Sequence, residues 1–328
     1  MTDTIVGIIA NPAAGKDIRR IVSQGRFISN QEKVNTLTRV MAGLEAAGVR
    51  RVVFMPDIAM LGAAASAEAS KTIATEILDF AHHNEERDST TAAAMMVEMG
   101  AGCLVTLGGD GTNRAVAKGC GDVPILPIST GTNNVFPTMV EGTIAGLAAG
   151  VVARGDMDLE AVTTASKALE VHVDGQLKDL ALVDVAVSKE RFVGARAIWD
   201  IDTLHEIFLA RAEPASIGLS SIGSRLLPLG AGDDRGLYMR LGEGGVHVDA
   251  PIAPGNIRRV GVQEWRTVDM GEPVPIGLQP STIALDGERT FSLRPKSAAD
   301  VVLTWGGPRV VSIEKTLAEA SRQGLFRS

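Results

Sequence analysis

Short apolar runs, separated by longer amphipathic segments, dominate the first half of the chain. Each apolar run is rich in β-branched residues and has the length of a buried strand. Four runs predict strands, at residues 4–10, 51–55, 103–107 and 124–128. Strands that alternate with helices predict a doubly wound α/β domain with a parallel sheet, in which ligand-binding loops follow the carboxyl ends of the strands.

Two of the intervening segments have helical periodicity. The first, residues 31–48, ends at Gly48 and places a set of apolar side chains on one helical face. These side chains are Val34, Leu37, Val40, Met41 and Leu44. The second segment, residues 88–100, predicts a helix with Asp88 or Ser89 as its N-cap.

From about residue 156 the pattern changes to alternation of apolar and polar residues with glycine-containing turns, which is typical of β-hairpins. The clearest turn is the Asp-Gly pair at 174–175. Residues 156–307 therefore predict an antiparallel β-sandwich, with one helix near 202–212. The last segment, 308–328, predicts a strand and a helix that pack back on the α/β domain, which we expect to span residues 1–155.

Composition and charge exclude several classes of function. The chain has 328 residues, a net charge of −7 and two cysteines. This charge argues against nucleic-acid binding, and the apolar runs are too short to span a membrane. The first ten residues carry an acid where a signal peptide has positive charge, and two cysteines make no disulfide framework. We expect a cytoplasmic protein that binds neither membranes nor nucleic acids and forms a homo-oligomer.

The strand at 103–107 runs into a turn that contains three glycines and one aspartate in four positions, Gly108 to Gly111. A helix follows, with Thr112 or Asn113 as its predicted N-cap and Gly119 at its end. An Asp-Gly hairpin is the alternative, but no second alternating strand follows the turn. A glycine turn at a helix N-terminus exposes backbone N–H groups and admits close approach, so it predicts a phosphate site.

Two further loops at strand ends, NPAAGK (11–16) and STGTNNVFP (129–137), combine small residues with Asn or Thr. The first is not a P-loop, since Ala10 replaces the first glycine and Asp17 replaces Ser or Thr. In a doubly wound sheet the three loops converge on one crevice. The predicted nucleotide-binding residues are Asn11, Pro12, Gly15, Gly108, Gly109, Gly111, Thr112, Asn113, Gly131, Thr132, Asn133 and Asn134.

Four charged positions in the second half have both a functional and an ordinary interpretation. Asp184 interrupts the apolar run ALVDVAV, where the alternative is a solvent-facing acid on a strand. Asp286 and Glu288 flank Gly287 in ALDGER, where the alternative is a hairpin turn with two exposed acids. Arg196 either contacts a phosphate or forms a surface ion pair. The histidines and acids of HHNEE (82–86) favour a solvated loop, and the sequence identifies no metal ligands.

The motifs resemble those of the NAD kinase and diacylglycerol kinase-like superfamily. GGDGT follows a buried strand, NPAAG ends the first strand, and PISTGTNN follows a later one. Proteins of this superfamily pair an α/β domain that carries GGDGT with a C-terminal β-sandwich. The turn in ALDGER resembles the Asp-Gly-Glu turn of the lipid-kinase branch. GGDGTNRAVA, STGTNNVFP and FVGARAIW most resemble the subgroup of acetoin catabolism protein X (AcoX-like). The resemblance covers most of the chain.

For ATP-NAD kinases, the resemblance implies transfer of a phosphoryl group from ATP to a ribose hydroxyl of NAD, which gives NADP and ADP. It implies that Asp110 orients this hydroxyl and takes its proton late, while Mg²⁺ on the ATP neutralises the phosphate charge. Glu288 is the second candidate for a catalytic carboxylate. We expect the acceptor, NAD or another hydroxylated metabolite, to contact Asp184, Arg196 and Asp286.

One departure from the NAD kinase pattern concerns the acceptor. NAD kinases hold NAD with an Asn-Glu pair in an Ala-Leu-Asn-Glu context, and the matching stretch here is ALVD, with Val183 and Asp184. Valine makes no side-chain hydrogen bond, so we expect NAD to be a weak acceptor or to be replaced by another metabolite. The alternatives are a non-catalytic ATP or NAD sensor of acetoin catabolism and a lipid kinase, although no amphipathic surface helix is predicted that would dock on a membrane.

Overall fold

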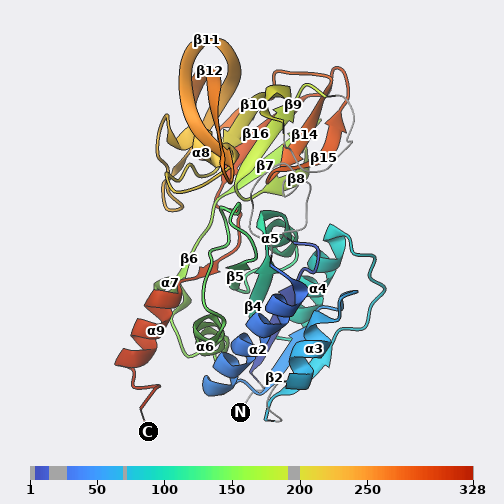
Figure 1. Cartoon of the computed structure of the whole chain (residues 1–328), viewed down its shortest axis with the longest axis vertical. Coiled ribbons are helices and arrows are strands. Elements are labelled where there is room, and N and C mark those ends of the chain that lie inside the picture. The colour runs from blue at the N-terminus through green and yellow to red at the C-terminus, as the bar shows by residue number, and fades with distance from the viewer. Residues whose placement is uncertain (1–3, 15–27, 69–71, 191–199, 328) are drawn as a thin grey trace.

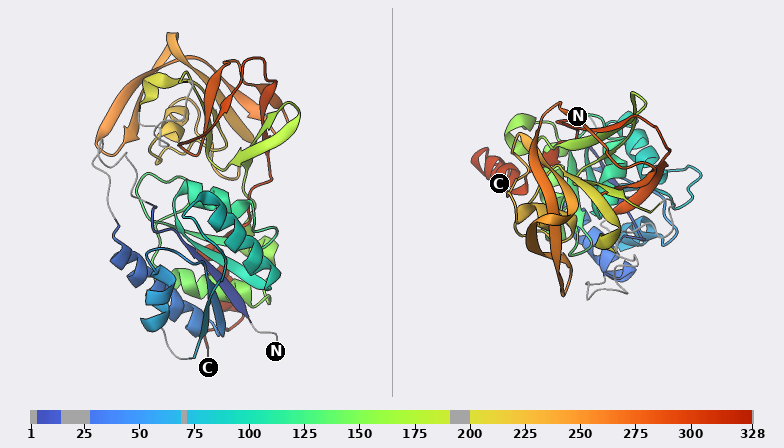
Figure 2. Two further views of the ribbon diagram at one scale, coloured as in Figure 1. Left: turned by 90° about the vertical axis from the view of Figure 1, so that its right-hand side faces the viewer. Right: turned by 90° about the horizontal axis from the view of Figure 1, so that it is seen from above.

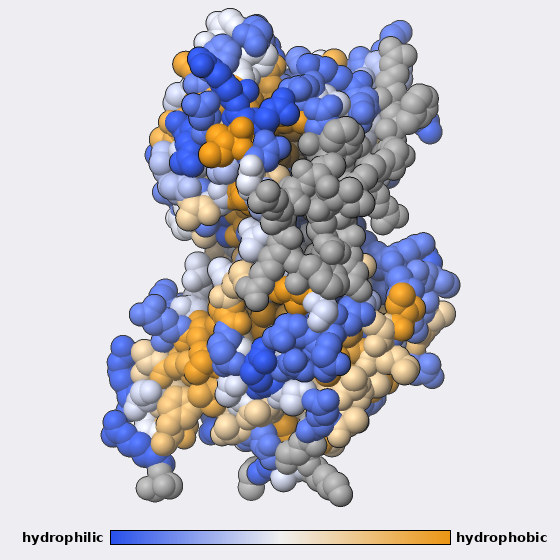
Figure 3. Space-filling view, in the orientation of Figure 1, coloured by the Kyte–Doolittle hydropathy of each residue, from blue (hydrophilic) through white to orange (hydrophobic). Residues whose placement is uncertain are grey.

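The computed structural model describes residues 4–14, 28–68, 72–190 and 200–327. Two domains are stacked along the long axis of the molecule (Figure 1). One combines a sheet with helices, and the other consists mainly of strands. The two ends of the chain lie on the first domain, away from the strand-rich domain (Figure 2). Figure 3 shows that the surface narrows between the two domains.

The first domain contains a seven-stranded sheet with the order β3-β2-β1-β4-β5-β17-β6. Its strands are β1 (Ile5–Ala10), β2 (Arg51–Phe54), β3 (Ala74–Ile77), β4 (Ala101–Gly108), β5 (Ile125–Ser129), β6 (Thr163–Thr164) and β17 (Val310–Val311). Neighbouring strands are parallel, except that β17 and β6 are antiparallel. The four strands predicted in the first half are confirmed, and β17 and Ala320 of the last segment pack on this domain.

Helices cover both faces of the sheet. The apolar cluster on one face joins β1 and β4 to α2 (Asn30–Ala46), α3 (Leu61–Glu68), α6 (Gly142–Ala153), α7 (Leu159–Val162) and α9 (Ile313–Arg322). The cluster on the other face includes α4 (Glu86–Glu98) and α5 (Asp110–Ala117). This second cluster also contains Ala168, Leu182 and Val183 of the strand-rich domain, so the two domains share apolar packing.

The predicted helix caps were wrong at two helices. The N-cap of α4 is Glu85, and Asp88 lies at the third helical position, where its carboxylate accepts from the Glu85 N–H at 3.0 Å. The N-cap of α5 is Gly109, which places Thr112 and Asn113 inside the first turn. Both helices therefore begin before the predicted cap. The N-cap of α5, Gly109, has an extended backbone and no side chain, so the sequence offers no capping residue at this position.

The second domain contains two antiparallel sheets. One has the order β12-β11-β10-β9-β14-β15 and the other β13-β16-β7-β8. The first sheet comprises β9 (Asp184–Ser188), β10 (Leu204–Leu209), β11 (Arg235–Ala253), β12 (Asn256–Asp269), β14 (Ser281–Leu285) and β15 (Glu288–Leu293). The second comprises β7 (Ala168–Val173), β8 (Gln176–Ala181), β13 (Pro273–Pro275) and β16 (Ala299–Thr304). One apolar cluster joins the two sheets, which confirms the β-sandwich.

The helix expected near 202–212 is absent from that segment, which forms the 3₁₀ turn Ile201–Thr203 and strand β10. This strand is buried between β9 and β11, so apolar side chains occur on both of its faces and imitate helical periodicity. A helix, α8 (Leu219–Ser224), follows later. The Asp-Gly turn predicted at 174–175 is confirmed between β7 and β8, with both residues at positive φ.

The chain leaves the first sheet only after β6, which pairs with β17. The division between residues 155 and 156 stays a prediction. None of the helices in the described ranges is long and apolar enough to cross a membrane.

Candidate active site

The glycines around Asp110 bring three parts of the chain close together. A Cβ atom on Gly108 would lie 2.5 Å from Thr112 Oγ1, and one on Gly109 would lie 2.8 Å from Asn134 Oδ1. A Cβ on Gly111 would instead lie 3.6 Å from the Glu288 carboxylate of the second domain. The first two glycines therefore allow the turn and its neighbouring loop to pack. The third lies where α5 faces the β-sandwich.

The loop that follows β1 lies beside this turn because β1 and β4 are neighbours in the sheet. The Asn11 N–H donates to the Leu107 carbonyl at 3.0 Å, and Asn11 Nδ2 donates to Thr112 Oγ1 at 3.0 Å. Lys33, which the sequence did not single out, is fully buried and donates from Nζ to the carbonyls of Asn11, Pro12 and Ala14 at 2.9–3.0 Å. In the sequence, the available signal is the position of Lys33 next to Val34, the first apolar residue of the predicted helical face.

The loop after β5 is held by side-chain hydrogen bonds. Asn134 Nδ2 donates to Ser129 Oγ at 2.8 Å, and that hydroxyl donates to the Gly131 carbonyl at 2.7 Å. Thr132 Oγ1 donates to Asn133 Oδ1 at 3.2 Å. The Thr130 N–H donates to the Gly108 carbonyl at 3.2 Å, so this loop also meets the glycine turn.

Asn113 is fully buried within the turn itself. Its Oδ1 accepts from the Thr106 hydroxyl at 2.6 Å, and its Nδ2 donates to the Gly109 carbonyl at 2.9 Å. The Asn113 side chain therefore links the end of β4 to the glycine turn. A contact between Asn113 and a nucleotide stays a prediction, as do the other nucleotide-binding assignments.

Asp110 joins α5 to the loop after β5. Its Oδ1 accepts from the N–H groups of Val135 at 3.1 Å and Phe136 at 2.8 Å, and its Oδ2 accepts from Val135 at 3.1 Å. These backbone donors orient the carboxylate against the loop after β5.

Asp184 and Asp286 of the second domain are buried, so the alternative interpretation of them as exposed acids is wrong. Asp286 has φ +51° in the turn between β14 and β15, and its Oδ1 accepts from the N–H groups of Leu182 and Val183 at 3.0 and 2.8 Å. Asp184 Oδ1 in turn accepts from the Gly287 N–H at 3.3 Å. Each acid thus supplies an acceptor to the backbone beside the other, and this mutual bonding compensates for their burial.

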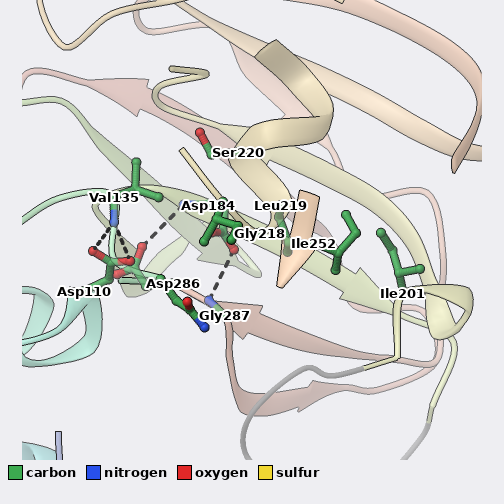
Figure 4. Close-up of a pocket in the computed structure, with 12 residues that line it drawn as sticks. Asp110, Val135, Asp184, Ile201, Gly218, Leu219, Ser220, Ile252, Asp286 and Gly287 are labelled. Atoms are coloured by element: carbon green, nitrogen blue, oxygen red, sulfur yellow. Dashed lines mark hydrogen bonds between the residues drawn. The ribbon is translucent and has the colours of Figure 1, made fainter. Parts of the chain in front are cut away.

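Acids of both domains line one pocket (Figure 4). The first domain contributes Asp110, Asn133 and Val135. The second contributes Asp184, Ile201, Ile217, Gly218, Leu219, Ser220, Ile252, Asp286 and Gly287. Carboxylates on one side and aliphatic side chains on the other suit a ligand that combines hydroxyl groups with an apolar part.

Arg114 is a further residue of this region that the sequence did not single out. It lies one helical turn after Asp110 and is buried, with Nη2 donating to Glu86 at 2.7 Å and Nε 4.0 Å from Asp286 Oδ2. Burial raises the pKa of Asp286, while Arg114 and the backbone donors act in the opposite direction. The available signal was its spacing of four residues from Asp110, which puts both on one face of the helix.

Two predicted site residues, Gly15 and Arg196, lie outside the described residues. Among the residues whose placement is described, no three His, Cys, Asp or Glu side chains are grouped so that they could hold a metal ion.

Two family profiles and one curated relative match the chain. The profile described as the ATP-NAD kinase N-terminal domain matches residues 6–157. The profile of the acetoin catabolism protein X C-terminal domain matches residues 167–306. Acetoin catabolism protein X of Cupriavidus necator is 38% identical over 338 aligned positions, which cover 99% of this chain and 94% of the relative. The chain belongs to the acetoin catabolism protein X family. The domain of this chain that carries Asp110 is also similar to the N-terminal domain of ATP-NAD kinases, which confirms the predicted resemblance.

Proposed function

We propose that this member of the acetoin catabolism protein X family is an ATP-dependent kinase that phosphorylates a hydroxyl of NAD or of a related metabolite. The observation that carries this proposal is the pocket in which Asp110, on the ATP-NAD kinase-like domain, faces Asp184 of the second domain. A carboxylate at the start of a helix, beside a pocket that both domains line, is suited to orient a hydroxyl beside phosphates.

The described residues fit a nucleotide at the N-terminus of α5. Gly109 and Gly111 present backbone without side chains there, and the loops after β1 and β5 meet the same turn through Asn11 and Thr130. Phosphate oxygens would accept from the first N–H groups of the helix, where the helix dipole is favourable. Glu288 lies beside Gly111 across the domain interface, so it borders this position.

Asp110 would accept the hydrogen bond of the acceptor hydroxyl and take its proton as the phosphoryl group is transferred. Its two bonded N–H partners hold it ready for this task, and Asp184 offers a second acceptor for hydroxyl groups in the same pocket. Asp286 would act less directly, because three backbone N–H groups of residues 182–184 already use its carboxylate. It sets the position of Asp184.

The carboxylates of the described site do not form a cage for a metal ion. Mg²⁺ commonly binds through one or two carboxylates together with substrate phosphates, so we propose that it enters with ATP. When bound, it would neutralise phosphate charge.

A screen for ADP formation from ATP in the presence of NAD, NADH and small hydroxylated metabolites tests the proposal. Asp110→Asn should lower turnover by about 10²–10⁴, the usual contribution of a general base, while ATP still binds. Asp249→Asn, at an exposed position of β11, is the matched control and should retain activity. Because asparagine offers one acceptor oxygen instead of two, thermal unfolding of both variants must be compared.

The screen also separates the alternatives. ATP binding with no acceptor-dependent ADP formation would favour a nucleotide sensor. ADP formation with diacylglycerol alone would favour a lipid kinase. Normal turnover of a folded Asp110→Asn variant would contradict the proposed role of Asp110 and leave Glu288 as the leading candidate.

A further inference from the structure

A second buried arginine crosses between the domains in the direction opposite to Arg114. Arg211 lies just beyond the end of β10, and only 6% of its surface is exposed. Its guanidinium carbon is 5.1 Å from the centre of the Phe136 ring, which belongs to the loop after β5 in the first domain. A guanidinium over an aromatic face at this distance is a cation–π contact, and it is stronger where water is excluded.

Phe136 is the residue whose N–H donates to Asp110 Oδ1 at 2.8 Å, the shortest bond that this carboxylate makes to the loop. A contact on the Phe136 ring therefore acts on the backbone that orients Asp110. Arg211, Phe136 and Asp110 form a continuous series of contacts from the β-sandwich to α5.

The guanidinium of Arg211 is buried although its side-chain nitrogens have poor hydrogen-bond partners. Its Nη1 is 3.7 Å from Glu213 Oε1, which is too long for a hydrogen bond, and its buried Nε has no hydrogen-bond partner in the part of the chain that the structure describes. The carboxylates of Glu213, Asp110 and Asp286 attract the guanidinium, while the Lys167 ammonium repels it. A buried charge with an unsatisfied donor is costly, and an apolar side chain of similar size would avoid that cost.

We propose that Arg211 is a positioning residue for the phosphoryl acceptor site, which holds the Val135–Phe136 backbone against Asp110 and so keeps this carboxylate in its working orientation. The proposal rests on the proposed kinase function, in which Asp110 acts on the acceptor hydroxyl. Small displacements of a catalytic group cost about 10²-fold in rate, so loss of this support should be visible in turnover.

Three substitutions test the proposal in the full-length protein. Arg211→Met removes the charge and keeps most of the side-chain length, Arg211→Lys keeps the charge, and Phe136→Leu removes the ring from beneath it. Arg266→Met is the matched control, because Arg266 makes a cation–π contact with Tyr238 at 5.8 Å within the second domain and away from Asp110. When steady-state kinetics are measured, the kcat of Arg211→Met should fall by about 10²-fold with little change in the KM for ATP. Arg211→Lys should restore part of it.

Amide hydrogen exchange supplies a readout that does not need activity. In Arg211→Met, and in Phe136→Leu if the first variant fails to fold, the N–H groups at positions 135 and 136 should exchange about tenfold faster than in the unmodified protein. Those of Leu182 and Val183, which are bonded to Asp286, should keep their protection. Arg266→Met should change neither pair.

The outcomes distinguish this proposal from the kinase function itself. Unchanged exchange at Val135 and Phe136, or an equal increase across the whole protein, would overturn the positioning role and leave Arg211 as a structural residue. If the unmodified protein transfers no phosphoryl group to any acceptor tested, the kinase proposal fails, while the exchange data still decide whether Arg211 holds the loop.

Discussion

Arg114 Nη1 donates to the carbonyl oxygen of Leu285 at 3.1 Å, so a helix of the first domain supplies a hydrogen-bond donor to a strand of the second. The same side chain lies 4.0 Å from Asp286 and donates to Glu86 at 2.7 Å. Leu285 ends β14 immediately before the turn formed by Asp286 and Gly287, which leads into Glu288 at the start of β15. Arg114 therefore anchors this turn to α5, one helical turn from Asp110.

Arg114→Met should destabilise the protein by about 3–5 kcal/mol, because it leaves a buried carboxylate without its cation and a buried carbonyl without its donor. Lys118→Met is the control. Lys118 pairs with the same Glu86 at 2.8 Å, but its side chain is 26% exposed, so its loss should cost about 1 kcal/mol or less. Denaturant unfolding measures both. Equal effects of the two substitutions would show that Arg114 acts as an ordinary surface charge.

The cost of Arg114→Met should decrease as the solution is made more acidic. Burial raises the pKa of Asp286 in the folded protein, because the ionised carboxylate is poorly solvated there. Above this pKa the folded protein bears the cost of the buried charge, and protonation removes that cost as the pH falls below it. Without Arg114 the pKa of Asp286 should rise further. The difference in unfolding free energy between the variant and the unmodified protein should therefore be smaller at pH 5 than at pH 8. A constant difference would mean that Asp286 does not take up a proton.

Lys167 predicts a pH dependence of opposite sign. It is fully buried and donates from Nζ to the carbonyls of Gly230 and Arg235 at 3.2 and 2.9 Å, and burial lowers its pKa from 10.5 to about 8. Between these values the unfolded chain binds a proton that the folded protein has lost, so stability rises with pH. Unfolding free energies from pH 7.5 to pH 10 should rise for the unmodified protein relative to Lys167→Met. Parallel curves would contradict the lowered pKa.

The local features of the first domain could be predicted from the sequence because they depend on neighbours along the chain. The strand at 103–107, the glycine turn and the helix after it are each visible in a window of about a dozen residues. Parallel pairing then places the loops after β1, β4 and β5 side by side, and Asn11 meets Thr112 as expected from that rule.

The acids of the second domain could not be interpreted in the same way. Asp286 is bonded to the backbone of Val183, 103 positions away, and neither segment shows that the other will satisfy it. Without a visible partner, an acid in a turn or on a strand is interpreted as exposed. Arg114 and Arg211 escaped notice for the same reason, since their partners Leu285 and Phe136 lie in the opposite domain.

Gly111→Ala tests the nucleotide site without disturbing the fold. Gly111 lies within α5, and an added Cβ would make an ordinary 3.6 Å contact with Glu288, so alanine should leave the fold intact or stabilise it by up to about 1 kcal/mol. If ATP phosphates approach the backbone here, calorimetry should show at least about tenfold weaker ATP binding. Gly119→Ala is the contrasting variant, because its Cβ would lie 2.3 Å from the Thr90 carbonyl and should reduce stability. Undiminished ATP affinity in folded Gly111→Ala would place the phosphates elsewhere.

The acceptor is tested at Val183 and Asp184, the two positions that depart from the NAD kinase pattern. Val183 is fully buried in the apolar cluster shared by the domains, and its N–H is bonded to Asp286 at 2.8 Å, whereas Asp184 lines the pocket. Val183→Asn should therefore bury an amide without partners and cost about 1–3 kcal/mol of stability.

A site that lacks one buried hydrogen-bond partner binds more weakly by about 1–3 kcal/mol, or about fivefold to a hundredfold, so the unmodified protein should use NAD poorly or not at all. Asp184→Glu extends the carboxylate by one methylene into the pocket and should improve NAD phosphorylation, measured as NADP formation under saturating ATP. Asp300→Glu is the control, because Asp300 lies on β16 in the four-stranded sheet and Asp184 lies on β9 in the six-stranded sheet. Efficient use of NAD by the unmodified protein, with a low KM, would show that the valine is no obstacle and that NAD is the acceptor. If neither the unmodified protein nor the Asp184→Glu variant forms NADP, but another hydroxylated metabolite is phosphorylated, the pocket is built for that metabolite.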